Sequence, residues 1–197
     1  MQRRILKERA KLILGGRIFS DTWLWALLAL AIADAIHSLA GTVLPGVGAL
    51  LVTGPMALGS SYVILKLVRT RQKIDFKDLF AGFSQDIGQN ILLGFLSSLF
   101  VALWSLLFVI PGIVKAYGYG MIYYIKADHP EYDWRTCLQA SQQMMYGHKM
   151  DLFVLDLSFI GWYFVGSLCL GVGALWVHPY HETTRALFYE QLKQNIQ

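Results

Sequence analysis

Four stretches of this chain are apolar over about the length that a membrane-spanning helix needs. A helix rises about 1.5 Å per residue, so roughly 20 residues cross the roughly 30 Å of hydrocarbon in a bilayer. The four stretches are 22–44, 46–68, 88–110 and 152–170. Only 15% of the 197 residues are charged, against about 25% in an average soluble domain. The sequence therefore predicts an integral membrane protein and argues against a disordered chain, a coiled coil or a disulfide-stabilised secreted domain.

Two further stretches, 112–127 and 173–189, are shorter or more polar. Each follows a strong stretch after a short turn that contains glycine, near Pro111 in one case and near Gly171 in the other, and Pro45 marks a similar turn between the first two stretches. Backbone polar groups in lipid must be satisfied within helices. We therefore expect one all-α membrane domain over residues 1–197, with six transmembrane helices arranged as three helical hairpins. Five spans, with the C-terminal tail outside, is the main alternative.

A segment with helical periodicity precedes each predicted hairpin. Its apolar residues recur at the spacing that places them on one face of a helix, and Asp75 and Asp133 precede the second and third segments as candidate N-caps. The positions on this face are Ile5, Leu6, Leu12 and Ile13 in the first segment, Phe76, Leu79, Phe80 and Phe83 in the second, and Trp134, Cys137, Leu138, Ser141 and Met145 in the third. We expect three amphipathic helices on the cytoplasmic surface of the membrane.

The recurring order of surface helix, span, turn and returning span predicts an internal repeat. The string Gly-Val-Gly-Ala-Leu occurs at 46–50 and again at 171–175, each time at a turn between paired spans. The three predicted units are 1–68, 69–127 and 128–197. A five-residue match can arise by chance in a glycine-rich chain, so the order of the elements carries most of this prediction.

The positions of the Lys and Arg residues predict the orientation of the chain. Basic residues concentrate before the first span, between the second and third spans and around 126–149, whereas the turns near Pro45, Pro111 and Gly171 carry no charge. By the positive-inside rule the surface helices and both termini are cytoplasmic. The net charge of +4 then reports orientation, and we expect no nucleic-acid partner.

The lipid bilayer is the expected partner of this chain, and anionic lipid headgroups or another membrane protein are further candidates. Basic side chains near an anionic membrane surface gain roughly 1 kcal/mol each. The candidate headgroup contacts are Arg3, Arg4, Lys7 and Lys11. The alternative is that these residues serve only to set the topology.

Several polar side chains fall within the predicted spans, where an ionisable group costs about 2.5 to 3.5 kcal/mol and is a candidate for function. Asp34 and His37 are one helical turn apart in the first span, Lys115 lies just inside the fourth, and Asp156 lies near the cytoplasmic end of the fifth. The candidate intramembrane network comprises Asp34, His37, Lys115, His178, His181, Glu182 and Arg185.

Three interpretations of this network compete. A zinc site would use His and carboxylate ligands, but His178-x-x-His181-Glu182 lacks the His-Glu-x-x-His order of zinc proteases, and we expect neither metal nor cofactor. A proton or substrate relay through Asp34 and His37 is the second interpretation. The third is structural, with Asp34 neutralised by Arg185 or Lys115 and the histidines hydrogen-bonded between helices.

The two cysteines, Cys137 and Cys169, form no C-x-x-C pair. The predicted topology places Cys137 at the cytoplasmic surface and Cys169 near the far side of a span. We therefore expect two free thiols.

The C-terminal two-thirds contains an ordered series of motifs at 79–83, 103–107, 110–113, 127–128, Ser141, 144–145, 147–149, 152–153, 157–162, 179–180 and 188–189. This series resembles the domain-of-unknown-function 975 family of bacterial membrane proteins. The resemblance covers about 75–190 well. It implies a multipass membrane protein, chiefly of Gram-positive lineages, and brings no established activity, catalytic residue or binding residue.

Two classes of function follow from the sequence. The chain contains no phosphate-binding loop, nucleophile elbow or Cys/His cluster, so we do not expect an enzyme. The first class is a non-catalytic scaffold, regulator or immunity-type protein that acts on lipid or on partner membrane proteins. The alternative is a small carrier or lipid-handling protein with a polar path between the repeats. A polar cavity that reaches the charged residues would favour the carrier.

Overall fold

The computed structural model describes residues 3–16, 20–43, 47–84, 86–168 and 172–196, and every regular element in these ranges is helical. Four helices are long and apolar enough to cross a membrane: 21–43, 48–70, 87–107 and 149–167. They correspond to α2 (Asp21–Val43), α3 (Val47–Thr70), α5 (Ile87–Leu107) and α9 (Lys149–Leu168). The four strong stretches of the sequence are thus confirmed as long helices, and they indicate a membrane protein.

The two weaker stretches behave differently from each other. Residues 112–127 do not form one helix, because α6 (Val109–Gly118) ends in a turn and α7 (Ile122–Asp128) begins after it. The last stretch lies in one continuous helix, α10 (Val172–Ile196), with Pro179 inside it. Ionisable residues occupy the middle of α10, and this helix is not among the four that are apolar enough to span. The prediction of six spans is therefore confirmed only for four helices.

The turn between α5 and α6 lies earlier than the prediction at Ile110–Ile113. Phe108 is the extended residue that separates the two helices, and α6 begins at Val109. Pro111 therefore lies in the first turn of α6, where the missing backbone N–H of proline removes no intrahelical hydrogen bond. A side chain on Gly112 would collide with Ser105, so glycine at this position lets α6 fold back closely on α5.

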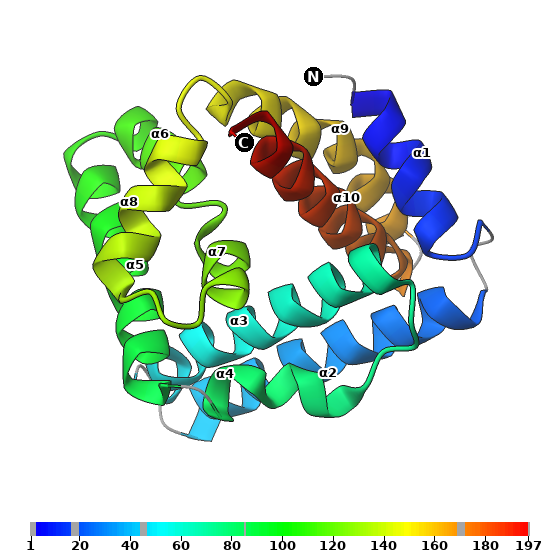
Figure 1. Cartoon of the computed structure of the whole chain (residues 1–197), viewed down its shortest axis with the longest axis horizontal. Helices are drawn as coiled ribbons and strands as arrows, with labels where there is room; N and C mark the ends of the chain where they lie inside the picture. The colour runs from blue at the N-terminus through cyan, green and yellow to red at the C-terminus, as the bar shows by residue number, and fades with distance from the viewer. Residues whose placement is uncertain (1–2, 17–19, 44–46, 85, 169–171, 197) are drawn as a thin grey trace.

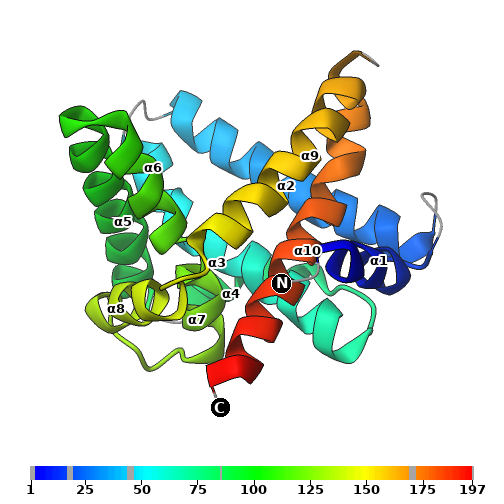
Figure 2. The same ribbon diagram turned by 90° about the horizontal axis from the view of Figure 1, so that it is seen from above.

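The α2–α3 pair and the α9–α10 pair cross each other steeply (Figures 1 and 2). In Figure 2 the C-terminal ends of α2, α5 and α9 all point to the upper side of the molecule. The short helices α4 (Ala81–Ser84), α7 and α8 (Trp134–Met144) and the end of α10 gather on the opposite side.

Helix α3 is the centre of the fold. Within its most apolar window 56% of the residues are buried, against 22% in each of α2, α5 and α9. Glycines permit its close contacts: a side chain on Gly54 would collide with the carbonyl of Asn90 in α5, and one on Gly59 would collide with the carbonyl of Leu79. Small residues allow helix backbones to approach in membranes. The small residues of α3 thus serve packing, while most of the surface of the other three long helices is left open to lipid.

The three segments before the hairpins are helical, with differences in detail. The third segment is α8, and its predicted face is buried at Cys137, Leu138 and Ser141. The second is a 3₁₀ helix, η1 (Phe76–Phe80), followed by α4, with Leu79 buried against α3. Asp75 and Asp133 cap these elements as predicted, accepting hydrogen bonds from the backbone N–H groups of Lys77 and Thr136.

The first segment is α1 (Arg3–Ile13), which packs against α10. Its buried residues are Leu6, Ala10 and Ile13, whereas Leu12 is 69% exposed. The predicted apolar face is therefore confirmed for Leu6 and Ile13 and is wrong for Leu12 and for Ile5, which is 41% exposed. Neither the internal repeat nor its boundaries are tested by this arrangement, and they stay predictions.

Candidate functional site between α2, α9 and α10

A histidine in the middle of α10 is held between two side chains of α9. His181 Nε2 lies 2.8 Å from Asp156 Oδ1, and the hydroxyl of Tyr163 lies 3.3 Å from His181 Nδ1. A neutral imidazole has one donor and one acceptor nitrogen. If Nε2 donates to the carboxylate and Nδ1 accepts from the tyrosine, both nitrogens of His181 have a partner.

Arg185, one helical turn further along α10, lies between two carboxylates. Its Nε atom is 3.8 Å from Asp156 Oδ1, and its Nη1 atom is 3.7 Å from Glu182 Oε1. These distances permit electrostatic attraction but exceed those of hydrogen bonds. Tyr124, from α7, donates a hydrogen bond of 3.2 Å to the other oxygen of Glu182. The buried Nε atom of Arg185 has no hydrogen-bond partner among the described residues.

A second acid–histidine pair joins α10 to α2. His178 Nδ1 lies 3.5 Å from Asp34 Oδ2, and the Asp34 side chain is 64% exposed. A cavity of about 280 Å³ extends from this pair toward Glu182 and Arg185. Its other lining residues come from α2, α3 and the α6–α7 region: Leu30, Ala57, Ser60, Ser61, Gly120, Tyr123 and Tyr124.

The structure brings five of the seven predicted network residues together and leaves out two. The five are Asp34, His178, His181, Glu182 and Arg185. His37 is exposed and makes no hydrogen bond or ion pair within the described part of the chain. Lys115 donates to Gln142 Oε1 at 3.2 Å and its Nζ lies 5.4 Å from the centre of the Trp104 ring, so it belongs to a separate contact of α6 with α5 and α8.

The structure agrees with the structural interpretation in placing both histidines against side chains of other helices, and it differs from that interpretation in the partner of Asp34. Asp34 pairs with His178 rather than with Arg185 or Lys115. Arg185 lies instead beside Asp156, a residue left out of the predicted network although its position near the end of the fifth span was noted. The acidic side chains of the site are Asp34, Asp156 and Glu182, and the single guanidinium is that of Arg185. Negative charge is therefore in excess whenever the two histidines are neutral.

A second charge cluster, which the sequence interpretation did not include, joins the ends of α3, α7 and α10. Asp128 accepts hydrogen bonds from Arg69, Tyr189 and Lys193, and its side chain is only 5% exposed. Burial alone would raise the pKa of Asp128, but the hydrogen bonds from these three groups outweigh it and lower the pKa to about 2. The only sequence signal was the motif Ala127-Asp128, within the family resemblance.

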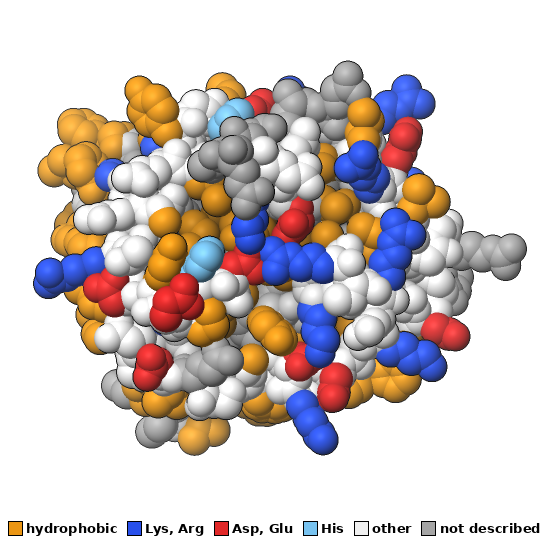
Figure 3. Space-filling view, in the orientation of Figure 1, with side chains coloured by type: hydrophobic (Ala, Val, Ile, Leu, Met, Phe, Trp, Pro, Cys, Tyr) orange, Lys and Arg blue, Asp and Glu red, His pale blue; other side chains and the backbone are white. Residues whose placement is uncertain are grey.

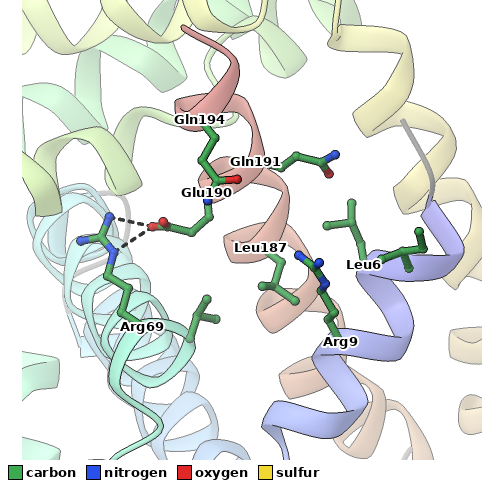
Figure 4. Close-up of a pocket in the computed structure, with 9 residues that line it drawn as sticks. Leu6, Arg9, Arg69, Leu187, Glu190, Gln191 and Gln194 are labelled. Carbon is green, nitrogen blue, oxygen red and sulfur yellow. Dashed lines mark hydrogen bonds and ion pairs between the residues drawn. The ribbon is translucent and has the colours of Figure 1, made fainter. Parts of the chain in front are cut away.

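A pocket of about 480 Å³ lies beside this cluster, between α1, α3 and α10. Figure 4 shows Arg69 reaching across from α3 to Glu190 of α10, while Arg9 of α1 lies on the other side of Leu187. The Arg69 Nη2 atom is 2.7 Å from Glu190 Oε1. In Figure 3 acidic and basic side chains meet near the centre of the face that is drawn.

The donor groups of the site do not form a metal centre. Within the described residues, no three His, Cys, Asp or Glu side chains gather in a way that could hold a metal ion. The acid–histidine contacts are pairs, Asp34 with His178 and Asp156 with His181. The zinc interpretation therefore gains no support from the geometry.

Comparison with known proteins gives a family match for the second half of the chain. The sequence profile of a family described as "Protein of unknown function (DUF975)" matches residues 106–196. The chain is thus similar to this family over residues 106–196, slightly less than half of its length. The match covers α6 to α10 and thus contains Asp156, His181, Glu182 and Arg185, whereas the resemblance seen over 75–105 lies outside it. Neither a curated protein sequence nor a solved structure matches the chain.

Proposed function

We propose that this protein is a non-catalytic carrier in the cytoplasmic membrane of a bacterium and that its cavity between α2, α3 and α10 receives a small polar solute with positive charge. The cavity of about 280 Å³ beside Asp34, Glu182 and Arg185 is the observation that carries this proposal. A water molecule occupies about 30 Å³ in the liquid, so the cavity has room for a solute of a few heavy atoms.

The proposed topology has six crossings, with both termini in the cytoplasm. The segment α6–α7 and helix α10 complete the second and third hairpins in this scheme. A helix that breaks near Gly120, or that carries charges at mid-membrane, is tolerated where it lines a cavity rather than lipid. Gly120 and the charged residues of α10 line the same cavity, which supports counting both elements as crossings.

The charge of the cavity supports a cationic solute. Exposed carboxylate at mid-membrane is costly, and the side chain of Asp34 is 64% exposed with only an imidazole as its partner. Water in the cavity, or a bound cation, would offset this cost. The hydroxyl groups of Ser60 and Ser61, which also line the cavity, can complete the hydrogen bonds of a small polar group.

The test is uptake into liposomes that contain the full chain. Radiolabelled methylammonium, guanidinium, sodium and potassium would be supplied in turn, and variants Asp34→Asn and Glu182→Gln would be compared with Glu131→Gln, whose carboxylate lies outside the cavity. We expect saturable uptake of at least one cation that falls at least tenfold in the two cavity variants and not in the control. If empty liposomes take up each cation as fast as liposomes that contain the original chain or any variant, the carrier proposal is wrong.

A scaffold, regulator or immunity-type protein is the alternative, and the turn between α5 and α6 favours it. Four apolar residues there are between 68% and 87% exposed: Leu106, Phe108, Val109 and Ile110. Such a surface could contact a partner membrane protein. If the protein is a scaffold, replacing Phe108 and Ile110 by serine should abolish co-purification of that partner. The cation uptake described above should then be absent in the original chain and in every variant.

A further inference from the structure

Helix α1 carries most of its positive charge on the side that faces α9 and α10. Lys7 Nζ donates a hydrogen bond of 3.2 Å to the backbone carbonyl of Ser158 and lies 4.1 Å from the centre of the Phe159 ring. Lys11 Nζ lies 5.7 Å from the centre of the Tyr180 ring. Both ammonium groups are thus held by carbonyl and aromatic groups, none of which carries a full negative charge.

A groove of about 390 Å³ runs between this face of α1 and the α9–α10 pair. Four basic side chains of α1 line it, and Glu8 is the one acidic residue among the lining residues. The four are Arg3, Arg4, Lys7 and Lys11. Glu8 is 3.0 Å from Arg4 across one turn of the helix. Figure 3 shows Lys and Arg side chains gathered over α1 at the upper right.

The positive charges in the groove are only partly compensated. Burial, and then repulsion from Lys11, lower the pKa of the Lys7 ammonium group. An anion between the two lysines would remove this repulsion. A phosphate group has several strong acceptor oxygens and could take hydrogen bonds from both ammonium groups and from an arginine.

The far wall of the groove leads onto the lipid-facing surface of α9. Trp162 lines the groove and is 56% exposed. Val165, which is 59% exposed, lies one turn from Trp162 on the same face of α9 and extends this apolar surface along the helix. Tryptophan is enriched where membrane and water meet. A ligand that fits both parts therefore has an anionic head and an apolar tail.

We propose that the groove between α1 and α9 is a binding site for an anionic phospholipid, with the phosphate among Arg3, Lys7 and Lys11 and an acyl chain along Trp162 and Val165. The site is separate from the cavity of the proposed carrier, since the two share no lining residue. A bound lipid would fasten α1 to the bundle at the level of the headgroups.

The experiment is native mass spectrometry of the full chain in detergent, titrated with phosphatidylglycerol or with phosphatidylcholine of the same acyl chains. The test variant is Arg3→Gln/Lys7→Gln/Lys11→Gln. The matched control is Arg71→Gln/Lys73→Gln/Lys77→Gln, which removes the same charge from η1 and from the connection that precedes it. At about fivefold per charge, we expect the test variant to bind phosphatidylglycerol on the order of a hundredfold more weakly and the control less than threefold.

Three results would overturn the proposal: equal weakening in the two triple variants, equal affinity for the two lipids, or displacement of phosphatidylglycerol by millimolar inorganic phosphate. The last result would identify a site for soluble anions. Because Lys7 also packs against Phe159, a second variant, Arg3→Gln/Arg4→Gln, leaves that contact intact. It should weaken phosphatidylglycerol binding about fivefold to twentyfold without a change in melting temperature, and unchanged binding in this variant also contradicts the proposal.

Discussion

Arg69 at the end of α3 and Asp128 at the end of α7 form an ion pair with two parallel hydrogen bonds. Nη1 lies 2.5 Å from Oδ1, and Nη2 lies 2.7 Å from Oδ2. Such bidentate pairs are among the stronger charged contacts in proteins. Lys193 of α10 binds the same carboxylate at 2.8 Å. A single buried acid therefore connects α3, α7 and α10, which are far apart in sequence and all line the cavity beside Asp34 and Glu182.

The replacement Asp128→Asn should destabilise the chain by about 2 kcal/mol at neutral pH. The pKa of about 2 in the folded chain lies below the unfolded value of about 3.9, so the carboxylate stabilises the fold above about pH 4. This contribution is lost as the pH falls through the folded pKa. Thermal unfolding in detergent at pH 7 and at pH 2 to 3 measures both effects. The melting temperature of the variant should change less with pH than that of the original chain.

The control for this prediction is Glu131→Gln, three residues away. Glu131 is an exposed acid whose partner is His129, and exposed pairs contribute little to stability. We expect a melting temperature within about one degree of the original chain. If Asp128→Asn unfolds at the same temperature and with the same pH dependence as this control, the cluster does not stabilise the fold.

The long helices could be predicted from the sequence because their signal is local. Uninterrupted apolar runs of membrane-spanning length give α2, α3, α5 and α9 directly. The break between α6 and α7 could not be predicted in this way, because it depends on a contact from elsewhere: Ser141 of α8 donates to the carbonyl of Gly118 and accepts from the N–H of Met121. These bonds replace the helical hydrogen bonds that the turn gives up.

The candidate site could be predicted as a set of residue types and only in part as a set of contacts. Spacing along one helix placed His178, His181 and Arg185 on one stripe, which is a local property. The choice of Asp156 as the partner of His181 depends on how α9 packs on α10. His37 was chosen for its position one turn from Asp34, but periodicity within a single helix does not say which residues of a face meet another helix.

The pair Asp156–His181 should be energetically coupled. In a double-mutant cycle with Asp156→Asn and His181→Gln, the coupling free energy should be about 1 kcal/mol, in the range of polar contacts between membrane helices. The exposed pair Arg4–Glu8 provides the comparison and should give less than about 0.5 kcal/mol. Unfolding in mixed detergent measures both values. A coupling near zero for Asp156–His181 would show that the contact is incidental.

The thiol of Cys137 should be unreactive in the folded chain. Cys137 is a buried free cysteine on α8, and burial raises its pKa to about 11. Because the thiolate is the reactive species, alkylation by N-ethylmaleimide at pH 7.5 should be at least about a hundredfold slower than in denaturant. Mass spectrometry of the peptide that contains Cys137 measures the rate. Rapid labelling without denaturant would place this face of α8 in solvent. Cys169 lies outside the described residues, so its predicted free thiol stays a prediction.

The contact between α3 and α5 should tolerate no side chain at Gly54. A methyl group there would collide with the backbone carbonyl of Asn90, and Gly94 lies directly opposite. Backbone atoms on a packed helix can give way only if the whole helix moves, so Gly54→Ala should cost about 3 kcal/mol or more, at the upper end of overpacking effects. Gly161→Ala is the matched control, because a methyl group on Gly161 of α9 meets no atom within 4 Å. Alanine exceeds glycine in helix propensity by about 1 kcal/mol, and the control should therefore unfold at the same temperature as the original chain or slightly higher. If both variants unfold alike, then α3 and α5 do not pack at Gly54.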